Sequence, residues 1–365
     1  MTKWGLWLVA LLIFSLLLFT VTACTLSATA TPEKVEHEAK HKDEHEHEHG
    51  KEEAEHEHEM LALSPVSLDT GEKLKVVATT SIVADVVENV GGDRIELTRL
   101  MPLGTDPHTF EPTPQDAVAV SDAHVLFANG AGLEEFLEPL LESAGAQGKT
   151  VYVSHGIESL HLEGEHAHEQ GEEEAEHEQE QEGEGEHHHE GADPHTWTDP
   201  LNVIVWVHNV GHALQDLDPD NAEVYEANAE AYETQLKELD AWIRDQVAQV
   251  PAAERRIVTD HDVFGYFVRR YGFVQAGTIV PGYSTLSEPS ARELAELEDA
   301  IRALSVKAVF VGNTVNPGLA ERVAEDTGTR LVFLYTGSLG AEGSGASTYV
   351  DYTRHNVNAI VGALK

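Results

Sequence analysis

Cysteine is almost absent from this sequence, because Cys24 is the only one in 365 residues. A single thiol excludes an intrachain disulfide, and it excludes any metal site built from several thiolates. Any metal that this chain binds must therefore be coordinated by nitrogen and oxygen atoms, which means by histidine and carboxylate side chains.

Basic residues are also scarce, since 23 Lys and Arg stand against 65 Asp and Glu, for a formal net charge of −42. Nucleic-acid binding requires a basic face, so a nucleic-acid partner is excluded. Many of the acidic residues lie in two tracts that alternate Glu with His, residues 33–59 and 158–190. Their low apolar content predicts a disordered tether over residues 24–72 and a long surface loop over residues 158–192.

The N-terminus carries an export pattern. Lys3 is followed by an apolar run over residues 4–19 and by small residues directly before Cys24. This pattern predicts a signal peptide over residues 1–23, with Cys24 becoming a lipid-modified N-terminus. The alternative is an uncleaved transmembrane anchor, because the run is nearly long enough to span a bilayer. Both interpretations place the rest of the chain outside the cytoplasm and attached to a membrane, at the cell surface or in the periplasm.

Strand-like and helix-like segments alternate through the rest of the chain. Strands are expected over residues 75–79, 95–101, 124–128, 150–153, 256–259, 273–279, 306–311 and 331–335. Helices are expected over residues 83–90, 114–121, 133–144, 200–214, 263–271, 290–304, 317–327 and 349–364. This order predicts an α/β fold of mostly parallel sheets with helices on both faces.

One predicted helix is much longer than the others. Asp218 is placed to cap it, Pro219 suits its first turn and Pro251 ends it, which gives a span of about 48 Å at 1.5 Å per residue. We therefore expect an N-terminal lobe over residues 73–217, a linking helix over 218–250 and a C-terminal lobe over 251–365. A cleft is expected between the two lobes.

Three histidines differ from the rest in their context. His108 and His195 share the pattern Asp-Pro-His-Thr-aromatic, and His261 follows a predicted strand in Thr-Asp-His-Asp. Ligands of open α/β sheets bind beyond the carboxyl ends of the strands, where His108 and His261 are expected. These three side chains are our candidate metal ligands.

The aspartates beside these histidines have a possible supporting role. Asp106, Asp193 and Asp260 can accept the ring N–H that does not face the metal, which fixes the tautomer. Most of the remaining histidines are assigned to ordinary hydrogen bonding, namely His124, His155, His208, His212 and His355. His208 and His212 have a spacing of four that can bind metal on a helix, but they lack the glutamate of a peptidase motif.

The chain resembles the zinc/manganese substrate-binding lipoproteins of ABC importers, the cluster A-I family, and within it the zinc type. The segments that carry the resemblance are residues 104–114, 193–200, 261–267, 270–272 and 340–349. The resemblance implies two lobes joined by a backbone helix, one metal in the cleft, and an ABC permease as partner. It assigns the metal-ligand roles to His108, His195 and His261.

One position departs from the family pattern, because Gly337 stands where many relatives have an acidic ligand. The fourth ligand is therefore open between a water and a carboxylate from elsewhere, with Asp262 as a weak candidate. Three imidazoles favour Zn²⁺ as the transported ligand, whereas Mn²⁺ prefers carboxylate and water oxygens. Copper and nickel remain open, since imidazole also suits them.

The expected function is an extracytoplasmic receptor that captures Zn²⁺ and delivers it to an importer, acting as a monomer and not as an enzyme. The alternatives are a receptor for Mn²⁺ or another divalent metal, and a zinc-dependent surface enzyme or adhesin. The loop tract is either a solvated linker or a set of auxiliary weak metal sites at His166, His168, His177, His187, His188 and His189.

Overall fold

The computed structural model describes residues 63–69, 71–161 and 191–365. The predicted signal peptide, Cys24, nearly all of the predicted tether and the six histidines of the loop tract lie outside these residues. Within them, no helix combines the length and the apolar character needed to cross a bilayer.

The N-terminal lobe is built on a parallel sheet with the strand order β2-β1-β3-β4. Its strands are β1 (Leu74–Ala78), β2 (Ile95–Arg99), β3 (Val125–Ala128) and β4 (Thr150–Tyr152). Its helices are α1 (Ser81–Gly91), α2 (Pro114–Asp122), α3 (Leu137–Ala144) and α4 (Pro200–Leu217), with short 3-10 turns η1 (Gly92–Arg94), η2 (Gln147–Lys149) and η3 (Thr196–Thr198).

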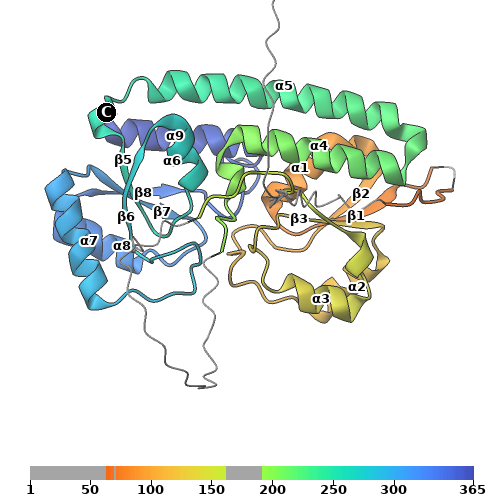
Figure 1. Cartoon of the computed structure of the whole chain (residues 1–365), viewed down its shortest axis with the longest axis horizontal. Helices are drawn as coiled ribbons and strands as arrows, with labels where there is room; N and C mark the ends of the chain where they lie inside the picture. The colour runs from red at the N-terminus through yellow and green to blue at the C-terminus, as the bar shows by residue number, and fades with distance from the viewer. Residues whose placement is uncertain (1–62, 70, 162–190) are drawn as a thin grey trace, which may run out of the picture. The chain divides into compact units, whose positions relative to one another are not determined.

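Both faces of this sheet are covered. Successive side chains of a strand point to opposite faces, so Val76 and Ala78 pack in the core under α1 and α4, while Val77 packs with α2 and α3. Figure 1 shows the two helix layers on either side of the orange and yellow strands.

The C-terminal lobe repeats this plan with the strand order β6-β5-β7-β8, again parallel. Its strands are β5 (Arg256–Thr259), β6 (Val274–Thr278), β7 (Ala308–Gly312) and β8 (Arg330–Leu334). Its helices are α6 (Gly265–Tyr271), α7 (Ala291–Leu304), α8 (Gly318–Thr327) and α9 (Tyr349–Leu364). The predicted fold of two parallel α/β lobes is thus confirmed.

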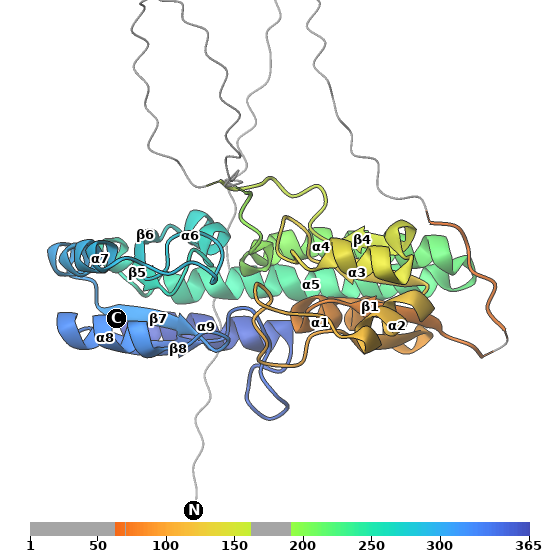
Figure 2. The ribbon, with the colours of Figure 1, turned by 90° about the horizontal axis from the view of Figure 1, so that it is seen from below.

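A long helix, α5 (Ala222–Val247), lies along both lobes. It packs against α1 and α4 of the first lobe and against α9 of the second, as Figures 1 and 2 show. Its buried side chains form one continuous stripe: Tyr225, Tyr232, Leu236, Leu239, Ile243 and Val247. A 3-10 turn, η5 (Ala252–Glu254), then leads into the second sheet.

The long helix is shorter than the sequence predicted, because it begins at Ala222 rather than near Pro219. The Asp218 side chain accepts hydrogen bonds from the Asn221 amide and the Tyr225 hydroxyl, both at 2.8 Å, instead of capping a helix. Residues Pro219–Asn221 form a 3-10 turn, η4. The 26 residues of α5 span about 39 Å.

Helix α3 also begins later than predicted, at Leu137 rather than at residue 133. The Glu134 carboxylate instead binds the loop before the helix, where it accepts hydrogen bonds from the backbone N–H of Asn129 at 2.7 Å and of Gly130 at 3.0 Å. Glu134 also accepts from the Thr79 hydroxyl at 2.6 Å, and its burial raises the pKa of its carboxyl group. Residues 133–136 therefore belong to this turn.

The carboxylate of Asp85 connects the two lobes. It lies on α1 and accepts hydrogen bonds from the Tyr232 hydroxyl on α5 at 3.0 Å and from the Tyr349 backbone at the start of α9 at 3.1 Å. Burial raises the pKa of Asp85 to about 6, although both hydrogen bonds favour its ionised form. The ionised form is therefore less favourable in the folded protein than in the unfolded chain.

We expect Asp85→Asn to stabilise the protein at pH 8 by about 3 kcal/mol, with most of the difference lost near pH 4. The folded-state pKa of Asp85 is above its unfolded value. Ionisation of the buried carboxylate therefore lowers the stability of the wild type as the pH rises from about 4 to about 6, and the full loss remains above pH 6. The Asn amide oxygen can accept both bonds. Urea unfolding of both proteins at pH 4, 6 and 8 measures this. Asp216→Asn, exposed on α4, is the control, and a pH-independent Asp85→Asn difference would contradict the assignment.

Candidate metal centre

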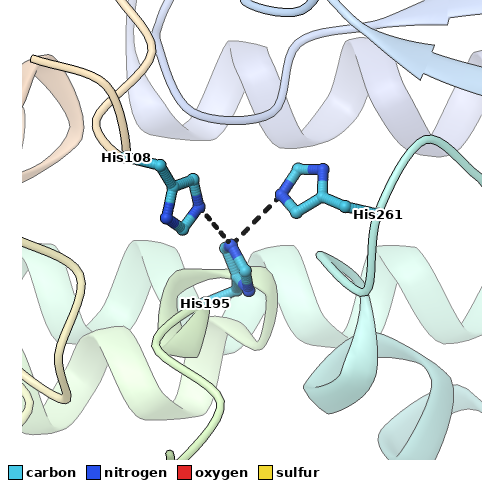
Figure 3. A group of neighbouring side chains, drawn as sticks. All are labelled: His108, His195 and His261. Carbon is cyan, nitrogen blue, oxygen red and sulfur yellow. Dashed lines mark hydrogen bonds between the residues drawn. The ribbon is translucent and has the colours of Figure 1, made fainter. Parts of the chain in front are cut away.

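Three imidazoles converge between the lobes. The Nε2 atom of His195 lies 3.2 Å from Nε2 of His108 and 3.3 Å from Nε2 of His261. One ring nitrogen of each residue lies within 4.8 Å of the other two. Figure 3 shows the three rings pointing toward one another from three separate segments.

Three loops carry these rings, two of them directly after strands. His108 lies in the loop after β2, His195 directly precedes η3 and α4, and His261 follows β5. In the second lobe, the next strand after β5, β6, lies on one side of it, and the chain then crosses to place β7 on the other side. Such switch points are where open α/β sheets bind ligands.

Two buried aspartates fix the orientation of two rings. The Nδ1 atom of His195 lies 2.8 Å from Oδ1 of Asp193, and Nδ1 of His261 lies 2.5 Å from Oδ1 of Asp260. The carboxylate accepts in each pair, so each Nδ1 carries a proton and each Nε2 is the ring atom turned toward the other rings. The Nε2 atoms are the metal-binding atoms of rings held in this way.

Burial also determines the charge of the rings. The His195 and His261 side chains are almost completely buried. Desolvation, together with the two neighbouring rings, lowers the pKa of His108 to about 2, and desolvation also lowers the pKa of His195 well below its usual value. The rings of His108 and His195 are therefore neutral at physiological pH, which is the form that coordinates metals.

Each of the two aspartates is anchored in its own lobe. Asp260 also accepts from the His261 backbone at 2.7 Å and from the Gly312 backbone at the end of β7 at 2.5 Å. Asp193 accepts from the His195 backbone at 2.9 Å, while its Oδ2 atom is buried without a hydrogen-bond partner among the described residues. Burial raises the pKa of Asp193 to about 7.

Asp106 does not support its histidine ring as we expected. Its Oδ1 atom accepts from the backbone N–H of His108 at 3.1 Å, and its Oδ2 atom accepts from the hydroxyl of Thr285 at 2.6 Å. Thr285 lies between β6 and α7 in the other lobe. Asp106 therefore stiffens the loop that carries His108 and ties it across the cleft.

No carboxylate joins the three histidines among the described residues. Asp262, the candidate fourth ligand, instead accepts at its Oδ2 atom from the Gly282 backbone at 3.1 Å. Gly337 packs against Pro107, so that a Cβ atom at position 337 would lie 2.7 Å from Cδ of that proline. An acidic side chain there would require Pro107 to move.

Several contacts of this region were not anticipated from the sequence. The Ser338 hydroxyl accepts from the Gly104 backbone at 2.8 Å and lies 3.3 Å from the Ser81 hydroxyl, which joins the lobes beside the cleft. Gly312 and Thr285 were also missed. Their roles depend on neighbours that are distant in sequence. Only Gly312 could have been noticed from the sequence, because a glycine at the end of an apolar strand indicates close packing.

Comparison with known proteins places the chain in a family. The family model for the periplasmic zinc-uptake complex component A matches residues 76–363. The chain belongs to this family. The manganese-binding lipoprotein MntA of Halalkalibacterium halodurans is 38% identical over 297 residues, which cover 81% of this chain and 90% of that protein. The manganese ABC transporter substrate-binding lipoprotein PsaA of Streptococcus pneumoniae is 32% identical over 302 residues, covering 81% and 90%.

A solved structure gives the same fold. The periplasmic zinc-binding protein TroA of Treponema pallidum superposes with a TM-score of 0.69 at 29% identity, covering 80% of this chain and 99% of TroA. The chain is thus a metal-binding substrate receptor of the ABC importer class and not an enzyme, as predicted. Its relatives differ in metal, since MntA and PsaA are described with manganese and TroA with zinc.

We expect Gly312→Ala to destabilise the protein by about 1–3 kcal/mol, because overpacking a full core costs that much. The new Cβ atom would lie 2.1 Å from Oγ1 of Thr336 and 3.1 Å from Oδ2 of Asp260. Urea unfolding of the metal-free protein measures the change. Gly362→Ala on α9 is the matched control, since its Cβ meets open space and the helix gains up to about 1 kcal/mol. Equal effects of the two variants would show that position 312 is not tightly packed.

Proposed function

We propose that this protein captures Zn²⁺ through His108, His195 and His261 and delivers it to an ABC importer. The observation that carries the proposal is the donor set: three imidazoles converge, and no carboxylate of the described residues joins them. Imidazole nitrogen suits zinc, whereas manganese favours carboxylate and water oxygens. A water completes the tetrahedron in this proposal.

The spacing of the rings supports a tetrahedral ion. Zn–N bonds of about 2.0–2.1 Å at tetrahedral angles separate the nitrogens by about 3.3–3.4 Å. The two Nε2 separations from His195 are 3.2 and 3.3 Å. Both separations match a shared tetrahedral ion, and the ring nitrogens of all three residues lie within 4.8 Å of one another.

The names of MntA and PsaA make a manganese receptor the alternative. Position 337 favours zinc over that alternative, because Gly337 supplies no side-chain oxygen and packs closely on Pro107. A chain that lacks this carboxylate offers manganese fewer hard ligands.

The remaining parts of the proposal concern location and release. We propose that Cys24 carries a lipid anchor and that a monomer meets the permease outside the cytoplasm. The proposed ligands come from both lobes, so withdrawing His261 with its lobe would break the site. Lobe motion is expected to be small, because α5 and α9 pack together and both contact α1.

Zinc should outcompete manganese for the mature protein by at least two orders of magnitude in affinity, because the proposed ligands are nitrogens. Equilibrium competition of ⁶⁵Zn²⁺ against Mn²⁺ measures this. Replacing His108, His195 or His261 singly by Ala should abolish the tightest site, whereas His355→Ala on α9 should leave it unchanged. A manganese preference would reject zinc as the cargo but not the cleft as the site, and tight binding by all three variants would reject the cleft.

Two variants at one position test the basis of the preference. Gly337→Asp and Gly337→Ala introduce the same contact with Pro107, but only the first adds a carboxylate. If the donor set decides the metal, Gly337→Asp should raise manganese affinity relative to Gly337→Ala. Equal manganese affinities would mean that the carboxylate does not reach the ion.

We further propose that the loop tract collects zinc weakly at His166, His168, His177, His187, His188 and His189, through many imidazoles at high local concentration. Deleting residues 165–190 should then leave the tight site intact and remove the weaker ones. Calorimetric titration with Zn²⁺ measures both. An unchanged stoichiometry after deletion would make the tract a solvated linker.

A further inference from the structure

A second group of histidines and carboxylates lies outside the cleft, on the hairpin formed by α4 and α5. The two helices pack side by side, and a groove with a volume of about 250 Å³ lies open on the surface between them. Its floor is formed by small residues, since a Cβ atom on Gly211 would lie only 3.7 Å from Cβ of Ala229. Its walls carry two imidazoles and three carboxylates: His208, His212, Glu226, Glu230 and Glu233.

The spacing on each helix places these groups on one face. His208 and His212 are one turn apart on α4, and Glu226, Glu230 and Glu233 follow at one-turn intervals on α5. Two histidines four residues apart on a helix can bind one metal ion from the same side. The groove thus presents the residue types and the spacing of a transition-metal site.

One edge of such a site is already formed. Nε2 of His208 lies 3.0 Å from Oε2 of Glu233, and the His208 side chain is 50% exposed. A zinc ion bonded to one nitrogen and one oxygen at about 2.0–2.1 Å would separate those atoms by about 3.3 Å. A small displacement therefore lets an ion replace the shared proton.

The remaining ligand must rotate into place. The donor atoms of His208, His212 and Glu233 do not all lie within 4.8 Å of one another. His212 is exposed and lines the same groove as His208, so its ring is not held by burial in its present orientation. Lys237 pairs with the other oxygen of Glu233, but Glu226 and Glu230 leave the groove with net negative charge.

We propose that this groove is a second divalent-metal site, in which His208, His212 and Glu233 bind Zn²⁺ on the outer surface of the first lobe. The site is weaker than the cleft, because its ligands are exposed and one of them must be reoriented. It is independent of the proposed cargo, since a manganese receptor could carry the same groove.

Hydrogen exchange on the full chain tests the proposal. The cleft is first loaded with one equivalent of Zn²⁺, and further Zn²⁺ is then added as the probe. At a free concentration ten times the dissociation constant, amides in the groove halves of α4 and α5 should exchange about tenfold more slowly. The double variant His208→Ala/His212→Ala should lose this slowing while it keeps the effect of the first equivalent.

The matched control is His155→Ala/His161→Ala, which removes two imidazoles from the same lobe outside the groove and should retain the slowing. In crystals soaked with Zn²⁺, an anomalous peak should lie about 2.0–2.1 Å from a ring nitrogen of His208 and of His212. Wild-type exchange on the hairpin that does not respond to excess Zn²⁺ would overturn the proposal. So would slowing that persists in the groove variant.

Discussion

The structure of the cleft depends on two buried aspartate–histidine pairs. Asp193 and Asp260 each accept a ring N–H and thereby turn the opposite ring nitrogen toward a common point. Burying carboxylates beside neutral rings is costly unless a positive charge compensates them. A cation bound at the opposite nitrogen would supply that charge through the ring. The same two contacts therefore orient the rings and favour a cation at their centre.

The fold explains why these pairs meet. Both lobes use the same strand order, and their loops at the carboxyl ends of β2 and β5 carry His108 and His261 into one cleft. The lobes are also joined away from the rings, by Asp85 against the start of α9 and by Asp106 against Thr285. Because the three rings come from segments of both lobes, their separations depend on how the lobes pack against each other.

The sequence predicted the strands, most helices and the three converging histidines, because these depend on local patterns. The repeated Asp-Pro-His segment fixes its own backbone, and apolar alternation marks each strand whatever lies beside it. The sequence misplaced the starts of α3 and α5, since Glu134 and Asp218 bind partners outside a helix terminus. It also assigned Asp106 to a ring rather than to Thr285. The Asp106–Thr285 hydrogen bond joins residues 179 positions apart, so no local sequence pattern can predict it.

The cleft and the proposed groove site differ in how well their side chains are preorganised. Both present imidazoles, and both place a carboxylate against one of them. In the cleft, aspartates bind Nδ1 of His195 and of His261, so that the Nε2 atoms of these two buried rings face the centre of the site. In the groove the carboxylate of Glu233 occupies the metal-facing nitrogen of an exposed ring. A metal ion in the groove would therefore have to replace a hydrogen bond and order exposed side chains, and these costs are smaller where the rings are already fixed.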